Sequence, residues 1–151
     1  MKLEFEKMII KDLDNIKDNL ESDFDDFWNY NILKSELEND LSYFIVCKYN
    51  EEIIGFAGFK KVLDEADIMN IVIKKQYQNK KIGTALFNQL IILAKSLNIN
   101  ILNLEVNENN IYAIKLYKKF DFKEVGKRKF YYNNNDTAIL MSKQLKNMSN
   151  F

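Results

Sequence analysis

A strand-like run that leads through a basic loop into a long amphipathic helix is the feature that most restricts how this chain can fold. The mostly apolar residues Ala66–Ile73 predict a buried strand that ends at Lys74. Leucines then recur at helical spacing and predict a helix over residues 82–97; they are Leu86, Leu90, Leu93 and Leu97. A second strand is predicted over Ile101–Val106. A crossover of this kind is right-handed and makes its two strands parallel.

The loop that joins the first strand to the helix is basic and ends at a glycine just inside the helix, Gly83. Its lysines are Lys74, Lys75, Lys80 and Lys81. The unpaired amides of a first helical turn point outward, and the helix dipole favours an anion there. We therefore expect a phosphorylated ligand at this loop.

A carboxylate is predicted at the same end of the strand–helix–strand unit. Ligands of such units bind at the carboxyl ends of the strands, where both Gly83 and Glu105 lie. Because successive strand side chains point to opposite faces, Glu105 is expected opposite the apolar face of its strand. That face consists of Leu102, Leu104 and Val106. Glu105 is thus predicted at the mouth of the crevice that the phosphate loop opens.

The helix predicted over residues 110–120 adds a phenol. Its apolar residues form one stripe, made of Ala113, Ile114, Tyr117 and Phe120. The ring of Tyr117 is expected to pack toward the sheet, with its hydroxyl within reach of the same crevice.

The composition excludes several chemistries. Histidine is absent, so no Ser-His-Asp triad, Cys-His dyad or His-ligated zinc is possible, and no metal is expected. A general base must then be Asp, Glu, Lys, Tyr or water. The single cysteine, Cys47, lies in an apolar run and is expected to be an inert core thiol.

Acidic and basic residues balance at 22 each, so no overall charge predicts binding to nucleic acid or to a membrane surface. No apolar run approaches the ~18 residues of a membrane span. With one cysteine no internal disulfide can form, and a cytoplasmic protein is predicted.

The remaining segments continue the alternation of strands and helices. Strands are predicted over residues 3–9, 42–49, 53–62, 122–132 and 137–145, and helices over residues 12–20 and 27–38. The polar tripeptide Asn50-Glu51-Glu52 predicts a hairpin turn. We expect one domain over residues 1–146 and a loose tail over residues 147–151.

This ordered set of segments resembles the GNAT superfamily of acetyl-coenzyme A-dependent acyltransferases. Their signature loop runs Gln or Arg, two residues, Gly, one residue, and Gly or Ala. Here it begins at Gln78, has Lys81 at the first glycine and keeps the second as Gly83. The resemblance implies a single α/β domain in which a mixed, splayed sheet of about seven strands is flanked by about four helices. It also implies acetyl-coenzyme A as cosubstrate.

Within the superfamily the chain resembles the RimI-type N-terminal alanine acetyltransferases of a small-subunit ribosomal protein. The resembling segments are 62–66, 70–72, 104–106 with Asn110, 113–114, 116–117, Phe122, Arg128, 131–132 and 138–141. The chain departs from the branch at Lys81, at Asn107, where the branch has arginine, and at Asp121, where it has glycine. Aspartate tolerates a left-handed helix cap, so the change at Asp121 is expected to be structural only.

The resemblance implies a role for each matching residue. Backbone groups of Ile71, Val72 and Ile73 would contact the pantetheine arm. The pyrophosphate set would be Gln78, Asn79, Lys80, Lys81, Ile82, Gly83 and Thr84, with Asn110 as a further cofactor contact. Glu105 would be the general base and Tyr117 the general acid, and Tyr131 and Tyr132 would contact the substrate.

The reaction implied is direct acetyl transfer to a protein N-terminal amine, with the N-terminal alanine of a ribosomal protein as the expected acceptor. The enzyme is expected to be a monomer or weak homodimer. One alternative is acetylation of lysine or of a polyamine or antibiotic, for which Asp23, Asp25 and Asp26 could form an acidic acceptor pocket. Another is a non-catalytic coenzyme A-binding module, which the presence of both Glu105 and Tyr117 argues against.

Overall fold

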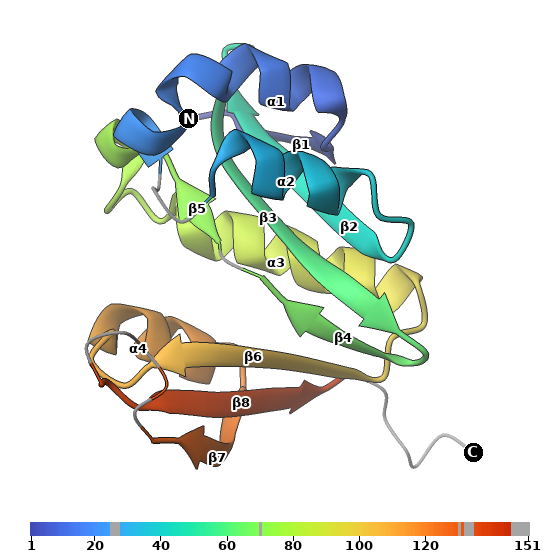
Figure 1. Ribbon diagram of the computed structural model, residues 1–151, viewed down its shortest axis with the longest axis vertical. Helices are drawn as coiled ribbons and strands as arrows, with labels where there is room; N and C mark the ends of the chain where they lie inside the picture. Colours follow the sequence, from blue (N-terminus) through green and yellow to red (C-terminus); the bar gives the residue numbers. More distant parts are fainter. Residues whose placement is uncertain (25–27, 70, 130, 132–134, 146–151) are drawn as a thin grey trace. The chain divides into compact units, whose positions relative to one another are not determined.

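In the computed structural model, which describes residues 1–24, 28–69, 71–129, 131 and 135–145, strands and helices are interspersed along the chain (Figure 1). The described residues form four α-helices and eight strands. They are grouped into two compact units, Met1–Lys61 with Met69–Leu93, and Val62–Ile68 with Ala94–Phe151. The predicted mixture of helices and strands is confirmed.

The first unit is built on antiparallel strands. The strand β2 (Ser42–Tyr49) pairs with β1 (Glu4–Lys7) on one side and with β3 (Glu52–Val62) on the other. Between β2 and β3 the predicted hairpin turn is confirmed. Asn50 and Glu51 form a two-residue turn with φ of 50° and 67°, the conformation that matches the twist of a tight hairpin.

Helical segments of the first unit supply the side chains that cover this sheet. The helix α1 (Ile10–Ile16) is continued by a 3₁₀ turn, η1 (Lys17–Asn19), and a π-helical turn, η2 (Leu20–Phe24). The prediction of regular helix up to residue 20 is therefore wrong beyond Ile16. Leu20 and Phe24 are four residues apart in this π-helical turn. Both side chains stay in the core, although the hydrogen-bond pattern differs from that of an α-helix.

The helix α2 (Tyr30–Leu37) begins where a side chain can cap it. Asn29 accepts a hydrogen bond of 2.9 Å from the N–H of Ile32, which satisfies one donor of the first turn. Leu33 of this helix is fully buried and belongs to the same core cluster as Trp28.

The predicted strand over Ala66–Lys74 is wrong as one continuous element. Residues Glu65–Ile68 form β4, which pairs in parallel with β6 (Ile101–Asn107) in the second unit. Residues Val72–Ile73 form β5, which pairs antiparallel with β3 in the first unit. An apolar run indicates burial but not the partner strand, so the change of partner could not be seen in the sequence.

The helix α3 (Ile82–Ser96) follows β5 after a short 3₁₀ turn, η3 (Lys75–Tyr77). It ends one residue before the predicted boundary, and its buried side chains keep the helical spacing. They are Ile82, Leu86, Phe87, Leu90, Ile91 and Ala94. Within the described residues, no helix combines the length and the apolar character needed to cross a membrane.

The second unit orders its strands β4-β6-β8-β7, with β7 (Lys123–Arg128) and β8 (Ala138–Gln144) antiparallel. The helix α4 (Ile111–Lys119) lies between β6 and β7 in the chain (Figure 1). The pairing of β4 with β6 confirms that these two strands are parallel, as predicted. The strand predicted over 122–132 ends at Arg128, and the predicted tail lies outside the described residues.

The sheet of the second unit opens along β6. The pairing with β4 runs from Glu65–Ile101 to Asp67–Asn103 and stops there, whereas the pairing with β8 continues to Asn107. The last four residues of β6 therefore pair with β8 alone among the described strands. This is the splayed geometry that the resemblance implies, and it leaves one backbone edge of β6 without a strand partner among the described residues just where Glu105 lies.

Candidate active site

The loop before α3 leaves unpaired backbone donors at the start of the helix. The carbonyl of Lys81 accepts the first helical hydrogen bond, 3.3 Å from the N–H of Ala85. Within the described residues, no backbone carbonyl accepts from the N–H groups of Ile82, Gly83 or Thr84. A lysine side chain has no acceptor to cap them. The amides lie at the positive end of the helix dipole, so this turn can bind an anion.

The loop takes its unusual path without glycine. Asn79 and Lys81 both have φ of 62°, in the left-handed region that glycine adopts without strain. A lysine there costs about 1–2 kcal/mol. Lys81 stands where the family pattern has its first glycine. The lysine keeps the left-handed backbone at that position, and it adds strain and a positive charge.

Gly83 is not required by the backbone of α3. Its φ is not positive, and a Cβ atom added there would meet one atom, Cγ1 of Ile73, at 3.9 Å. The first unit therefore has room for a side chain at this position. Any need for glycine would come from a ligand that lies against the helix.

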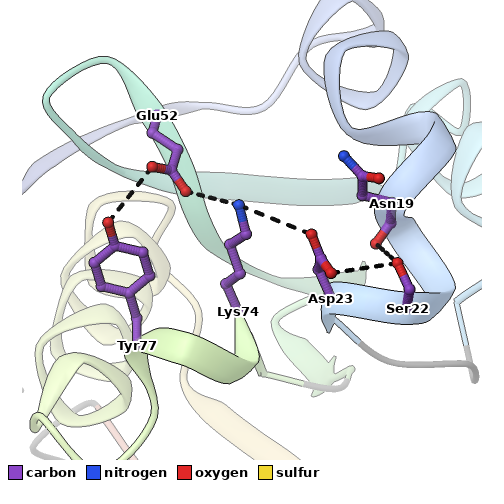
Figure 2. Close-up of polar contacts among 6 residues, drawn as sticks. All are labelled: Asn19, Ser22, Asp23, Glu52, Lys74 and Tyr77. Atoms are coloured by element: carbon purple, nitrogen blue, oxygen red, sulfur yellow. Dashed lines mark hydrogen bonds and ion pairs between the residues drawn. The ribbon is translucent and has the colours of Figure 1, made fainter.

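Lys74 differs from the other lysines near this loop. Its ammonium lies 2.7 Å from Oε2 of Glu52 and 4.0 Å from Oδ2 of Asp23 (Figure 2). The hydrogen bond to Glu52 is the main cause that raises the pKa of Lys74. In the described part of the chain Lys75, Lys80 and Lys81 have no ion-pair partner, and all three are exposed. The positive charge available to a phosphate therefore comes from these three lysines rather than from Lys74.

The open edge of β5 is also suited to a ligand. The N–H of Lys74 donates to the carbonyl of Ile54, so by the alternation of an antiparallel pair Val72 bonds to β3 and Ile73 faces away. The Ile73 carbonyl accepts a hydrogen bond of 3.1 Å from the side chain of Gln78. Among the predicted pantetheine contacts, Ile71 and Ile73 have the geometry to offer backbone groups, and Val72 does not. Gln78 holds the loop to the strand.

Glu105 is the exposed residue between two buried neighbours on β6, as predicted from the alternation of the strand. Its Oε1 lies 3.3 Å from Nη2 of Arg128, at the end of β7. The guanidinium of Arg128 lies over the ring of Tyr131, 5.4 Å from its centroid. The structure thus brings together one predicted catalytic residue, one predicted substrate contact and an arginine between them. Tyr132, the other predicted substrate contact, lies outside the described residues.

Arg128 as the partner of Glu105 was missed from the sequence. The two residues are 23 positions apart on strands separated by β8, and only the sheet order and register bring them together. Arg128 is the single arginine of the chain, which is the one signal that could have drawn attention to it.

The helix α4 is fixed at both ends near the second predicted catalytic residue. Asn110 caps its start, because its Oδ1 accepts a hydrogen bond of 3.1 Å from the N–H of Ala113. The half-buried Tyr117 packs against Phe122, with ring centroids 6.1 Å apart. Its backbone carbonyl also accepts from the N–H of Phe122 at 3.0 Å. These contacts fix the last turn of α4, from which Tyr117 projects.

The other two departures from the family pattern have structural explanations. Asp121 has φ of 67°, and its N–H donates to the carbonyl of Lys118, so it ends α4 in the predicted left-handed cap. Asn107 donates to Oδ2 of Asp136 at 2.9 Å and accepts from the N–H of Asn109. The neutral amide therefore holds the end of β6 to the segment that precedes β8.

Cys47 lies in β2 of the first unit and is fully buried. Burial raises the pKa of its thiol to about 11, so the thiolate is scarce at neutral pH. A covalent route through this residue is therefore disfavoured, as expected from the sequence.

Comparison with known proteins gives one consistent result. The chain matches the Acetyltransferase (GNAT) family over residues 9–122. A protein of Haemophilus influenzae named [ribosomal protein bS18]-alanine N-acetyltransferase is 40% identical over 106 residues, which cover 70% of each chain. A Bacillus subtilis protein provisionally named for the same activity is 34% identical over 136 residues, 89% of this chain and 90% of that protein. The crystal structure of the ribosomal-protein-S18-alanine N-acetyltransferase from Escherichia coli superposes with a TM-score of 0.87 at 26% identity and covers 99% of both chains.

Proposed function

The chain belongs to the Acetyltransferase (GNAT) family and is an acetyltransferase, and on that basis we propose that it acetylates the N-terminal alanine of a small-subunit ribosomal protein. The observation that carries this proposal is the similarity over nearly the full length to proteins named for that activity. The donor of the acetyl group is acetyl-coenzyme A.

The loop before α3 suits the pyrophosphate of the cofactor. Three unpaired amides at Ile82, Gly83 and Thr84, together with the exposed charges of Lys80 and Lys81, offer hydrogen bonds and positive charge to a phosphate. Backbone groups of Ile71 and Ile73 would bind the pantetheine arm. When bound, the cofactor supplies the activated acetyl group as a thioester.

Glu105 is proposed to accept a proton from the attacking amine. A protein α-amine has a pKa near 8, so at pH 7 roughly nine-tenths of it is protonated and cannot attack. A carboxylate on the open edge of β6 can take that proton directly or through water. Arg128, 3.3 Å away, orients the carboxylate. As the new N–C bond forms and the C–S bond breaks, Tyr117 would donate its phenolic proton to the departing thiolate, and the second proton that the nitrogen loses would restore the phenol.

The acceptor is proposed to lie against η2 of the first unit, which would form one wall of its binding site. A pocket of alanine size favours its substrate mainly by excluding larger side chains, because one methylene group changes binding by only about 1–3 kcal/mol. Peptides that begin with alanine, and next serine, should therefore react far faster than those that begin with leucine or phenylalanine.

The test is a competition among three acceptors: alanine-initiated peptides, the same peptides with a blocked N-terminus and an internal lysine, and spermidine. The lysine amine is harder to deprotonate, with a pKa near 10.4, which at neutral pH amounts to roughly 3 kcal/mol. The unblocked peptide should have the highest kcat/KM. A higher value for spermidine or for the blocked peptide would overturn the N-terminal acceptor.

One observation weighs against the polyamine alternative. Of the three aspartates that could attract a polycation, Asp23 already lies 4.0 Å from the ammonium of Lys74. The other two, Asp25 and Asp26, lie outside the described residues. The negative charge of such an acidic pocket would therefore be partly neutralised by Lys74 of the protein itself.

A further inference from the structure

Lys74 joins three segments of the first unit that are distant in the sequence. It directly follows β5, and its ammonium lies 2.7 Å from Glu52 at the start of β3 and 4.0 Å from Asp23 in η2 (Figure 2). The hydroxyl of Tyr77 in η3 donates to the other oxygen of Glu52, 3.4 Å away. The four side chains thus form a polar cluster that connects η2, β3 and the residues that lead into the cofactor loop.

The ammonium is the most buried charge of this cluster. The Lys74 side chain is 16% exposed, against 37% for Asp23 and 40% for Glu52. A partly desolvated ammonium depends on its counter-charges, and the two carboxylates depend on it in turn. Without the ammonium, Asp23 and Glu52 would face each other as like charges. Their repulsion would displace whichever of the two segments, η2 or the start of β3, is held more weakly.

That segment is η2. Its apolar side chains Leu20 and Phe24 are buried, and the ring of Phe24 lies 5.8 Å from that of Phe56. On its polar side, Ser22 bonds locally to Asn19 and Asp23. Among the described residues, the ion pair of Asp23 with Lys74 is the one polar side-chain contact that joins η2 to a distant segment. This ion pair therefore fixes the position of the polar side of η2.

We propose that Lys74 is a positioning residue for the acceptor: it holds η2, a proposed wall of the acceptor site, against the strand end that leads into the cofactor loop. This inference rests on the proposed function for the identity of the acceptor and for the role of η2 as a wall of its site. The cofactor is not expected to contact Lys74, because both of its nearest anions are carboxylates of the protein itself.

The first test is steady-state kinetics of Lys74→Met with an alanine-initiated peptide. KM for the peptide should rise about fivefold to tenfold, the scale expected for loss of a charged hydrogen bond and a partly exposed ion pair. The kcat and the Kd for acetyl-coenzyme A should stay within about twofold. Lys74→Arg should restore KM, because guanidinium keeps the charge. Lys48→Met is the matched control, since Lys48 also bridges two carboxylates, Glu6 and Asp12, at 3.3 and 3.5 Å.

The second test needs no substrate and so separates this inference from the proposed function. Amide hydrogen exchange over residues 20–24 should be faster in Lys74→Met than in the wild type and in Lys48→Met. Unchanged exchange in η2 would overturn the positioning role, whatever the enzyme acetylates. Faster exchange with an unchanged peptide KM would also overturn it, because η2 would then not be part of the acceptor site. Failure of the wild type to acetylate any N-terminal peptide would instead contradict the proposed function.

Discussion

Among individual residues, Glu105 and Tyr117 are placed by different kinds of force. Glu105 is exposed because strand alternation buries its neighbours Leu104 and Val106, and its position is then refined by Arg128. Tyr117 is held by packing on Phe122 and by the end of α4. One side chain is thus oriented by charge and the other by apolar contact, which suits the proposed base, which must be ionised, and the proposed acid, which must be neutral.

We predict that Glu105→Gln and Tyr117→Phe each lower kcat by roughly 10²- to 10⁴-fold, the usual range for positioned proton transfer. Both substitutions keep the shape of the side chain, so the Kd for acetyl-coenzyme A should barely change. Stopped-time assays and calorimetry measure the two quantities. Cys47→Ala is the control and should keep wild-type turnover, because its thiol is buried and protonated. A large loss in Cys47→Ala with near-normal Glu105→Gln would point to a covalent route.

Among the helices, α3 and α4 end in the same way. In each, a residue with positive φ follows the helix, Asn98 with φ of 59° and Asp121 with φ of 67°. The residue after it donates to a carbonyl in the last turn, Ile99 to Ala94 and Phe122 to Tyr117. Asparagine and aspartate tolerate this conformation better than other residues, although glycine adopts it most easily.

We predict that Asp121→Gly raises the free energy of unfolding and that Asp121→Ala lowers it. Both variants remove the carboxylate, which is 87% exposed and contributes little through its 4.0 Å pair with Lys143. They differ in the cost of the left-handed backbone, which is about 1–2 kcal/mol for a residue with a Cβ atom and exceeds the extra entropy of roughly 0.4–1 kcal/mol that glycine loses on folding. Denaturant unfolding of the pair measures the difference. Equal stabilities would show that the cap is not strained.

For the entire chain, stability and ligand binding are linked. The first unit contains the turn of unpaired amides at the start of α3, where the cofactor is proposed to bind, and the second unit contains Glu105 and Tyr117. A ligand that binds the folded state but not the unfolded chain shifts the unfolding equilibrium by mass action. Acetyl-coenzyme A should therefore protect the protein against heat.

We predict that acetyl-coenzyme A at one hundred times its Kd stabilises the wild type by about 2.7 kcal/mol. This corresponds to a Tm increase of roughly 5–10 °C for a chain of this size. Gly83→Glu should abolish the increase, since the structure has room for the side chain but its charge would oppose a phosphate. Asn88→Glu, at an exposed position five residues further along α3, is the matched control and should keep it. A normal shift in Gly83→Glu would place the phosphate site elsewhere.

Much of this fold could be predicted because its elements are defined by local patterns. The strand β2, the two-residue turn after it and the helix α3 follow from alternation, turn residues and helical spacing, all of which depend on near neighbours in the chain. The unpaired amides at the start of α3 and the exposed side of Glu105 were predictable for the same reason. The left-handed cap at Asp121 was predictable because the preference of aspartate is intrinsic.

Other features were decided by contacts that no local pattern contains. The apolar run over residues 66–74 is divided because its first part pairs with β6 and its last part with β3. The pairing of Arg128 with Glu105 depends on strand order, and the neutralisation of Lys74 depends on Glu52 and Asp23, which precede it by 22 and 51 positions. Hydrophobic burial can be satisfied by any apolar partner, and a charge by any opposite charge. Which partner is chosen is therefore a property of the folded arrangement of the chain.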